Sequence, residues 1–178
     1  MSELKIFTGP MYGGKTTRLL SALERYSYQK KKIALFKPSV DERYSVESVV
    51  THSGIEWSAH RVPNGSEILK QMPFCTDIVA VDEMFMIEGS ADALIELYKS
   101  GKTVLISTLQ LSYKAEPFEE VQKILPFATS VEVCPAVCFC GEDAHFTYRI
   151  GGGDKLIEVG GSEQYEPRCL KHIKYEKW

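Results

Sequence analysis

Residues 7–17 read FTGPMYGGKTT, a glycine-rich stretch that directly follows apolar residues. Residues 9–16 match G-x-x-x-x-G-K-[ST], the phosphate-binding loop. Glycines allow backbone N–H groups to point at phosphate oxygens, and the following helix presents its positive end to the same anion. The alternative interpretation is a simple turn between a strand and a helix. The motif predicts a set of nucleotide-binding residues, namely Gly9, Pro10, Met11, Tyr12, Gly13, Gly14, Lys15, Thr16 and Thr17.

Two of these residues have further predicted roles. Lys15 is expected to reach the β- and γ-phosphates of the nucleotide and so to take part in catalysis. The hydroxyl of Thr16 is expected to bind Mg²⁺. The motif therefore indicates binding of a nucleoside triphosphate with Mg²⁺, and it leaves the acceptor open.

The chain around this loop alternates between apolar strands and helical patterns. Helices are predicted after the loop, at 90–101 with Ser90 as N-cap, and at 118–125. Strands are predicted at 4–8, 33–38, 77–83 and 103–108. This alternation favours an α/β fold, a P-loop parallel sheet with flanking helices. The pattern changes near residue 134, so we expect a P-loop α/β domain over 1–133 and a small second subdomain over 134–178.

The third predicted strand ends in an acidic pair. Asp82 follows the apolar residues 78–81, and its carboxylate is expected to hold Mg²⁺ opposite Thr16. Glu83 comes next, and at the carboxyl end of a strand both side chains can reach the crevice where ligands bind in open α/β sheets. Such a pair allows one carboxylate to hold metal and the other to accept a proton. Acidic pairs also occur by chance at solvated strand ends.

Four potential metal ligands stand in two close pairs, Cys138 with Cys140 and Cys169 with His172, about thirty residues apart. This set fits a tetrahedral structural Zn²⁺, and the loop between the pairs would suit a lid over a small substrate. The alternative is a group of buried free cysteines beside a surface histidine. Cys134 is the nearest competing ligand, but it precedes Pro135, which favours an extended residue whose sulfur points away. Cys75 has no neighbouring ligand and is expected to be free.

Composition limits the class of protein. The chain has 178 residues, 44% hydrophobic and 25% charged, with a net charge of −3. An acidic protein is a poor general binder of nucleic acids or anionic membranes. No apolar run approaches the ~20 residues of a membrane span, and the first residues lack the features of a signal peptide. We therefore expect a cytoplasmic protein, in which cysteines bind metal or stay reduced.

These motifs together resemble the zinc-containing, P-loop type of thymidine kinase, the cytosolic and bacterial kind that some viruses also encode. The resemblance covers nearly the whole chain. It is carried by GPMYGGKTTRLL (9–20), KPSVDERYS (37–45), THSG (51–54), VDEMFM (81–86), AVCFCG (136–141) and GGSEQYEPRCLKH (160–172).

The resemblance implies transfer of the γ-phosphoryl group of ATP to the 5′-hydroxyl of thymidine or deoxyuridine. Glu83 would be the catalytic base and Asp82 the metal ligand. Asp41 and Arg43 match the family's D-x-R-Y-S segment and would help with metal and phosphate charge, Arg43 as a catalytic residue. The C-terminal zinc-binding part would be a lasso subdomain whose loop holds the base mainly through backbone groups. The positions that match the nucleoside pocket are Met11, Tyr113, Thr147 and Tyr165.

The family also implies a homotetramer and feedback by thymidine triphosphate. Three features depart from its pattern: Met84-Phe85-Met86 stand where a glutamine and an aromatic are common, Tyr113 replaces a phenylalanine, and a single residue separates Cys138 from Cys140. Two alternatives therefore remain. One is a P-loop ATPase or nucleotide-binding regulator without nucleoside specificity, and the other is a zinc-ribbon module that binds protein or nucleic acid.

Overall fold

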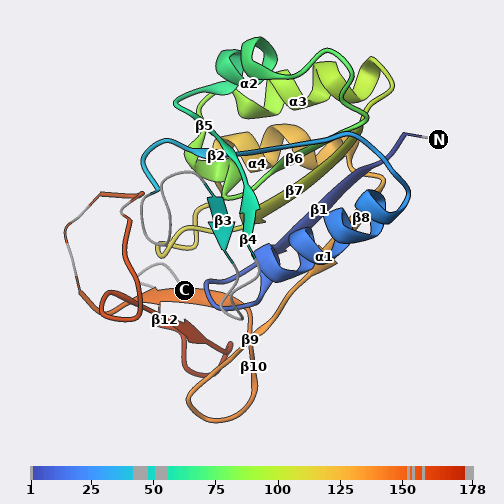
Figure 1. The fold of residues 1–178 in the computed structure, drawn as a ribbon. Coiled ribbons are helices and arrows are strands. Elements are labelled where there is room, and N and C mark those ends of the chain that lie inside the picture. The colour runs from blue at the N-terminus through green and yellow to red at the C-terminus, as the bar shows by residue number, and fades with distance from the viewer. Residues whose placement is uncertain are drawn as a thin grey trace.

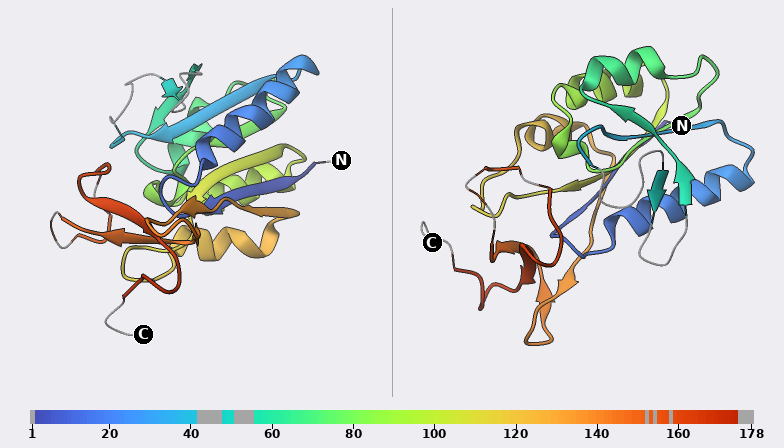
Figure 2. Two further views of the ribbon diagram at one scale, coloured as in Figure 1. Left: turned by 90° about the horizontal axis from the view of Figure 1, so that it is seen from below. Right: turned by 60° about the vertical axis from the view of Figure 1, so that its left-hand side comes forward.

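The computed structural model describes residues 2–41, 48–50, 56–151, 153, 155–157 and 159–174. A central sheet carries helices on both faces, and the C-terminal part forms a smaller lobe at one end (Figures 1 and 2). The sheet contains β1 (Leu4–Gly9), β2 (Ile33–Pro38), β5 (His60–Val62), β6 (Ile78–Val81), β7 (Thr103–Leu109) and β8 (Ser130–Val133). The helices are α1 (Lys15–Tyr28), α2 (Gly65–Gln71), α3 (Ser90–Lys99) and α4 (Glu119–Ile124), with the short turns η1 (Met84–Met86) and η2 (Leu125–Phe127).

Three two-stranded sheets accompany the six-stranded sheet in the described part of the chain. They are β3 (Ser48–Val50) with β4 (Glu56–Ser58), β9 (Ala136–Val137) with β10 (Asp143–Ala144), and β11 (Phe146–Arg149) with β12 (Tyr165–Arg168). The last four strands belong to the C-terminal lobe (Figure 2). No helix among the described residues is both long and apolar enough to cross a membrane.

The six-stranded sheet has the order β5-β2-β6-β7-β1-β8, and all of its neighbouring strands are parallel. A connection between parallel strands must cross a face of the sheet, and α1, α2, α3 and α4 do so after β1, β5, β6 and β7. The carboxyl ends of β1, β6 and β7 consequently lie close together at one edge. Ligands bind at this edge in open α/β sheets.

The core forms one layer on each face of the sheet. Alternate residues of β1 serve the two layers, as the period of a strand requires. Phe7 packs with the leucines of α1, whereas Ile6 packs with Leu94 of α3. Figure 1 shows α1 on one side of the sheet and α2, α3 and α4 on the other. The predicted α/β class with a parallel sheet is therefore confirmed.

Some predicted boundaries were wrong. The third strand ends at Val81 and not at residue 83, because Glu83 adopts a left-handed conformation with φ of 52°. Ser90 is the first residue of α3, and Gly89, with φ of 72°, is its N-cap. The sequence analysis also missed β5, α2 and β8.

The N-terminus of α3 is capped by a side chain of another helix. Glu120 of α4 is buried, and its carboxylate accepts hydrogen bonds from the backbone N–H groups of Gly89 at 3.0 Å and Ala91 at 2.7 Å. The hydroxyl of Ser90 donates to the same carboxylate and to the carbonyl of Met84. A negative charge at a helix N-terminus also interacts favourably with the helix dipole. The carboxylate of Glu120 therefore caps the N-terminus of α3, a role that was predicted for Ser90.

Replacing Glu120 with alanine should lower the free energy of unfolding by about 1–3 kcal/mol, because it leaves buried N–H groups without an acceptor. Urea unfolding followed by circular dichroism measures the change. The matched control is Glu119→Ala, which removes an exposed neighbour paired only with Lys123 among the described contacts. That variant should unfold nearly as the parent does. Equal destabilisation of the two variants would contradict the capping role.

Candidate active site

The phosphate-loop motif joins the end of β1 to the start of α1. Lys15 is the first residue of α1 and is buried, with its Nζ donating to the carbonyl oxygen of Pro10 at 2.6 Å. Gly14 and Tyr12 have positive φ values of 74° and 66°. The loop thus curls around the ammonium group of Lys15 and leads directly into the N-terminus of α1.

Two positions of the loop require glycine for a steric reason that the motif alone does not show. A Cβ atom on Gly9 or Gly13 would lie 2.2 Å from the backbone oxygen of Cys134. Cys134 follows β8, and its N–H donates to the carbonyl of Thr8 at 2.7 Å. The chain segment that leads into the C-terminal lobe therefore packs directly against the loop, and only glycine fits at these positions.

Thr16 and Asp82 lie next to each other at the edge of the sheet. The hydroxyl of Thr16 donates to Asp82 Oδ1 at 3.0 Å, and the hydroxyl of Ser107 on β7 donates to the same oxygen. Burial and the negative charge of Glu83 raise the pKa of the Asp82 carboxyl to about 6. A hydroxyl and a buried carboxylate side by side are hard oxygen ligands of the kind that Mg²⁺ prefers. The donor set therefore fits the predicted metal.

Glu83 is turned away from the direction that an extended strand would give it. Its left-handed backbone bends the chain directly after β6, and its N–H lies 3.4 Å from the hydroxyl of Ser107. Asp82 is bonded to Thr16, and Glu83 lines a neighbouring pocket. Ser107 was missed by the sequence analysis, although it is a polar residue at the end of an apolar strand.

A pocket adjoins the phosphate loop, and Met11 of that loop is part of its wall. Its wall includes Glu83 and all four positions predicted for a nucleoside pocket, Met11, Tyr113, Thr147 and Tyr165. These residues come from the loop, from the segment after β7 and from the C-terminal lobe. The structure therefore brings together residues that lie up to 154 positions apart (Met11 to Tyr165).

The rest of the wall is mainly apolar. Phe85 and Phe118 stack with their ring centroids 4.6 Å apart. In the segment Met84-Phe85-Met86, which departs from the family pattern, Phe85 and Met86 line the pocket, whereas Met84 is fully buried in the core. Sequence reasoning missed the contributions of Leu109, Ser112, Leu156, Ile157 and Gly160.

A hydrogen bond connects the phosphate loop to the C-terminal lobe. The N–H of Met11 donates to the hydroxyl of Thr147 on β11 at 3.1 Å. Thr147 is buried, so this bond is protected from water. One side of the pocket is therefore held by residues from both parts of the chain.

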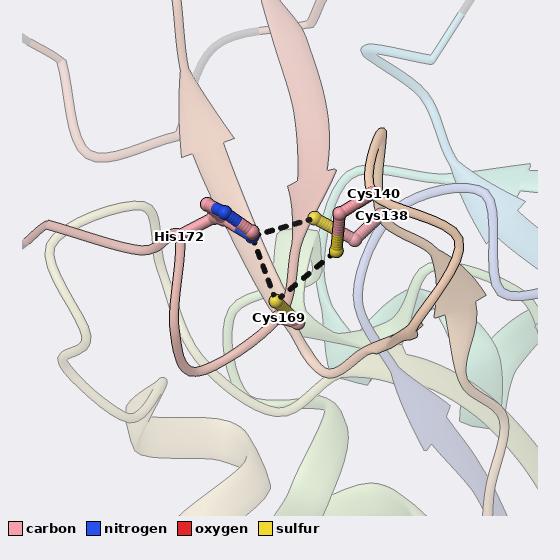
Figure 3. Close-up of side chains that lie close together, drawn as sticks. All are labelled: Cys138, Cys140, Cys169 and His172. Carbon is pink, nitrogen blue, oxygen red and sulfur yellow. Dashed lines mark hydrogen bonds between the residues drawn. The ribbon is translucent and has the colours of Figure 1, made fainter.

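Cys138, Cys140, Cys169 and His172 form a cluster whose ligand atoms all lie within 4.8 Å of one another (Figure 3). The Sγ atoms of Cys140 and Cys169 are 3.8 Å apart, and Nδ1 of His172 is 3.2 Å from Sγ of Cys169. Sulfur ligands of a tetrahedral Zn²⁺ lie about 3.8 Å apart, given Zn–S bonds of about 2.3 Å. The donor set and its spacing therefore fit the predicted metal.

The remaining cysteines lie elsewhere. Cys134 is buried beside the phosphate loop, and Cys75 is exposed in the segment before β6. Asp41 lies close enough to the acidic pair for its charge to help raise the pKa of Asp82. Arg43 and the segment 51–54 lie outside the described residues.

A parallel sheet whose first strand runs through a glycine-rich loop into a helix defines the P-loop class of nucleotide-binding folds. The family model described as thymidine kinase matches residues 2–173. The chain is 38% identical to a thymidine kinase of Pyrobaculum aerophilum, over 95% of this chain and 97% of that protein. It is 37% identical to a thymidine kinase of Thermococcus kodakarensis, over 95% of this chain and 92% of that protein. The chain belongs to the thymidine kinase family.

Proposed function

We propose that this protein transfers the γ-phosphoryl group of ATP to the 5′-hydroxyl of thymidine or deoxyuridine. The observation that carries the proposal is the position of Glu83. This carboxylate lines the pocket that contains the predicted nucleoside-binding residues, and it directly follows Asp82, which is bonded to the phosphate-loop residue Thr16. A nucleoside in the pocket would therefore have its hydroxyl near the phosphate loop.

Each residue of the site has a distinct part in this reaction. Lys15 would leave the carbonyl of Pro10 and bind the transferring phosphoryl group. Thr16 and Asp82 would hold Mg²⁺, which neutralises charge on the β- and γ-phosphates when it is bound. Glu83 would accept the proton of the nucleoside 5′-hydroxyl. The hydroxyl oxygen then bonds to the γ-phosphorus while the bond between this phosphorus and the ADP oxygen breaks. Arg43 would add positive charge at the phosphates, and Asp41 would help to hold the metal.

The pocket and the C-terminal lobe would select the nucleoside. Met11, Tyr113, Thr147 and Tyr165 would surround the base, with Tyr113 offering a ring on which a pyrimidine can stack. We treat residues 1–133 as the P-loop domain and 134–178 as the lasso subdomain. A cytoplasmic location, a homotetramer and inhibition by thymidine triphosphate are further parts of the proposal that derive from family membership.

The function is tested by measuring ATP consumption by the purified protein with and without thymidine. Consumption that requires thymidine and yields thymidine monophosphate supports the kinase. Hydrolysis that is independent of any nucleoside would indicate a P-loop ATPase instead. Neither reaction would indicate a binding module. Deoxyuridine and cytidine in parallel reactions define the range of acceptors.

We also propose one structural Zn²⁺ per chain, held by the four-residue cluster. Cys140→Ser or Cys169→Ser should lose the metal, because a closed tetrahedral site needs all four ligands. Structural zinc contributes folding energy, so the lasso subdomain should loosen in these variants. The KM for thymidine should rise more than the KM for ATP, since the phosphate loop lies in the other part of the chain. Metal content per chain and both KM values are measured.

Cys134→Ser is the matched control for these variants. Cys134 is buried like Cys138 and Cys169 but packs against the phosphate loop outside the cluster. This variant should keep its full zinc content. Zinc lost from Cys134→Ser and retained in Cys140→Ser would overturn the ligand assignment.

A further inference from the structure

Arg149 is the last residue of β11 and is bonded to three oxygen atoms. Its Nη1 donates to the backbone oxygens of Gly153 at 2.5 Å and Lys155 at 3.0 Å, and its Nη2 donates to the hydroxyl of Tyr165 at 2.5 Å. The first two acceptors belong to the loop of residues 150–164, here called the lasso loop. One guanidinium group thus connects this loop to β12.

The same guanidinium lies against two aromatic rings. Its Cζ is 4.1 Å from the ring centroid of Tyr113 and 5.1 Å from that of Tyr165. Both distances are within the range of favourable cation–π contacts. Tyr113 comes from the segment after β7 and Tyr165 from β12, so Arg149 holds together two parts of the fold. Both tyrosines line the pocket, while Arg149 is absent from the described residues of its wall.

The lasso loop contributes to the pocket but has little core of its own. Leu156, Ile157 and Gly160 line the pocket, yet both Leu156 and Ile157 keep about two-fifths of their surface exposed, at 41% and 39%. At its base the loop is closed by the N–H of Ile150, which donates to the carbonyl of Gln164 at 2.8 Å. The hydrogen bonds of Arg149 to Gly153 and Lys155 fix its first half.

We propose that Arg149 is a positioning residue that fastens the lasso loop and the two tyrosines in the geometry that binds the nucleoside. The inference rests on the proposed function, since it assigns the pocket to a nucleoside. Arginine suits this position because its planar group offers five donors and two stacking faces at once. A lysine has one compact, non-planar ammonium group, which cannot reproduce this forked set of donors beside two rings.

The chain offers a matched control in Arg168. Residues 149 and 165 face each other in the β11–β12 pair, as do residues 146 and 168. Side chains alternate along a strand, so Arg168 lies on the opposite face of this pair from Arg149. Its guanidinium pairs with Glu166 and lies 4.5 Å from the ring centroid of Phe139, and neither partner lines the pocket among the described residues.

The experiment compares Arg149→Met, Arg149→Lys and Arg168→Met in the full-length protein. Zinc content, hydrogen exchange of lasso-loop amides without substrate, kcat and the KM values for thymidine and ATP are measured. Arg149→Met should keep its zinc, speed exchange in the lasso loop, and raise the KM for thymidine roughly ten- to a hundredfold, as expected for lost charge-assisted hydrogen bonds. Its kcat and its KM for ATP should change less than about threefold.

The KM for thymidine and the exchange rates of Arg149→Lys should lie between those of the parent and of Arg149→Met. Lysine keeps the positive charge but replaces the forked guanidinium with a single ammonium group. Arg168→Met should keep the parent KM for thymidine and the parent exchange in residues 150–164. Unchanged exchange in Arg149→Met would overturn the proposal, and so would faster exchange with an unchanged KM for thymidine. A parent protein without thymidine-dependent ATP consumption would instead refute the proposed function, and the exchange measurement would then decide alone whether Arg149 fastens the loop.

Discussion

Replacing Lys15 with alanine should reduce thymidine phosphorylation by about a thousandfold or more while the fold persists. The ammonium group of Lys15 lies inside the phosphate loop, 2.6 Å from the oxygen of Pro10, where a γ-phosphate would replace that partner. Loss of one preorganised donor at a developing charge typically costs about a hundred- to a thousandfold in rate, and here a full positive charge is lost as well. Alanine favours the helix that begins at this residue, so α1 should form normally.

The measurement is steady-state turnover with saturating thymidine and ATP, accompanied by circular dichroism to show that the fold is kept. Lys31→Ala is the matched control, since it removes an exposed lysine beyond the other end of α1. That variant should retain the parent turnover. Near-normal thymidine phosphorylation by Lys15→Ala would refute the phosphate-loop assignment.

Replacing Glu83 with glutamine should lower kcat by roughly two to four orders of magnitude, the usual contribution of a general base. Glutamine keeps the size and shape of the side chain but accepts no proton. Glutamine should adopt the same left-handed backbone conformation as Glu83, so the shape of the pocket should be kept. The affinity for ATP should change little, because Thr16 and Asp82 remain to bind the metal.

Single-turnover rates and ATP binding by calorimetry separate these effects. Glu88→Gln, which changes an exposed glutamate five residues further on, should behave as the parent. Asp82→Asn is the comparison for a metal ligand and should weaken binding of ATP with Mg²⁺. If Glu83→Gln lost nucleotide binding as strongly as Asp82→Asn, Glu83 would be a metal ligand and another group would have to accept the proton.

Sequence patterns were sufficient for the local parts of the fold. Residues 33–36 and 104–106 are runs of consecutive apolar residues, which is typical of strands covered on both faces, and the structure has strands there. The cluster of Cys138, Cys140, Cys169 and His172 was also found from residue type and spacing, and its four ligand atoms do meet. The roles of these and the other site residues stay predictions.

Patterns failed where a local preference competed with a distant partner. Serine is a good N-cap, yet Ser90 lies inside α3, because Glu120 from another helix supplies the carboxylate that the helix start needs. The acidic pair was expected to continue its strand, but the chain turns at Glu83. The residues around Glu120 do not indicate that it caps another helix, and the residues around Glu83 do not indicate a turn.

The sequence by itself determined the class of fold, the phosphate loop and the four residues of the metal-type cluster, because each depends on residue type and spacing within short segments. Only the tertiary structure decided how these pieces form one site. It packed Cys134 against Gly9 and Gly13, joined Met11 to Thr147, and placed Arg149 against Tyr113 and Tyr165. Such contacts join residues that are far apart in the chain, so they follow from the strand order of the sheet and the packing of the C-terminal lobe on it. The spacing of apolar residues, every two positions in a strand or every 3.6 in a helix, reveals neither the strand order nor the packing of the lobe.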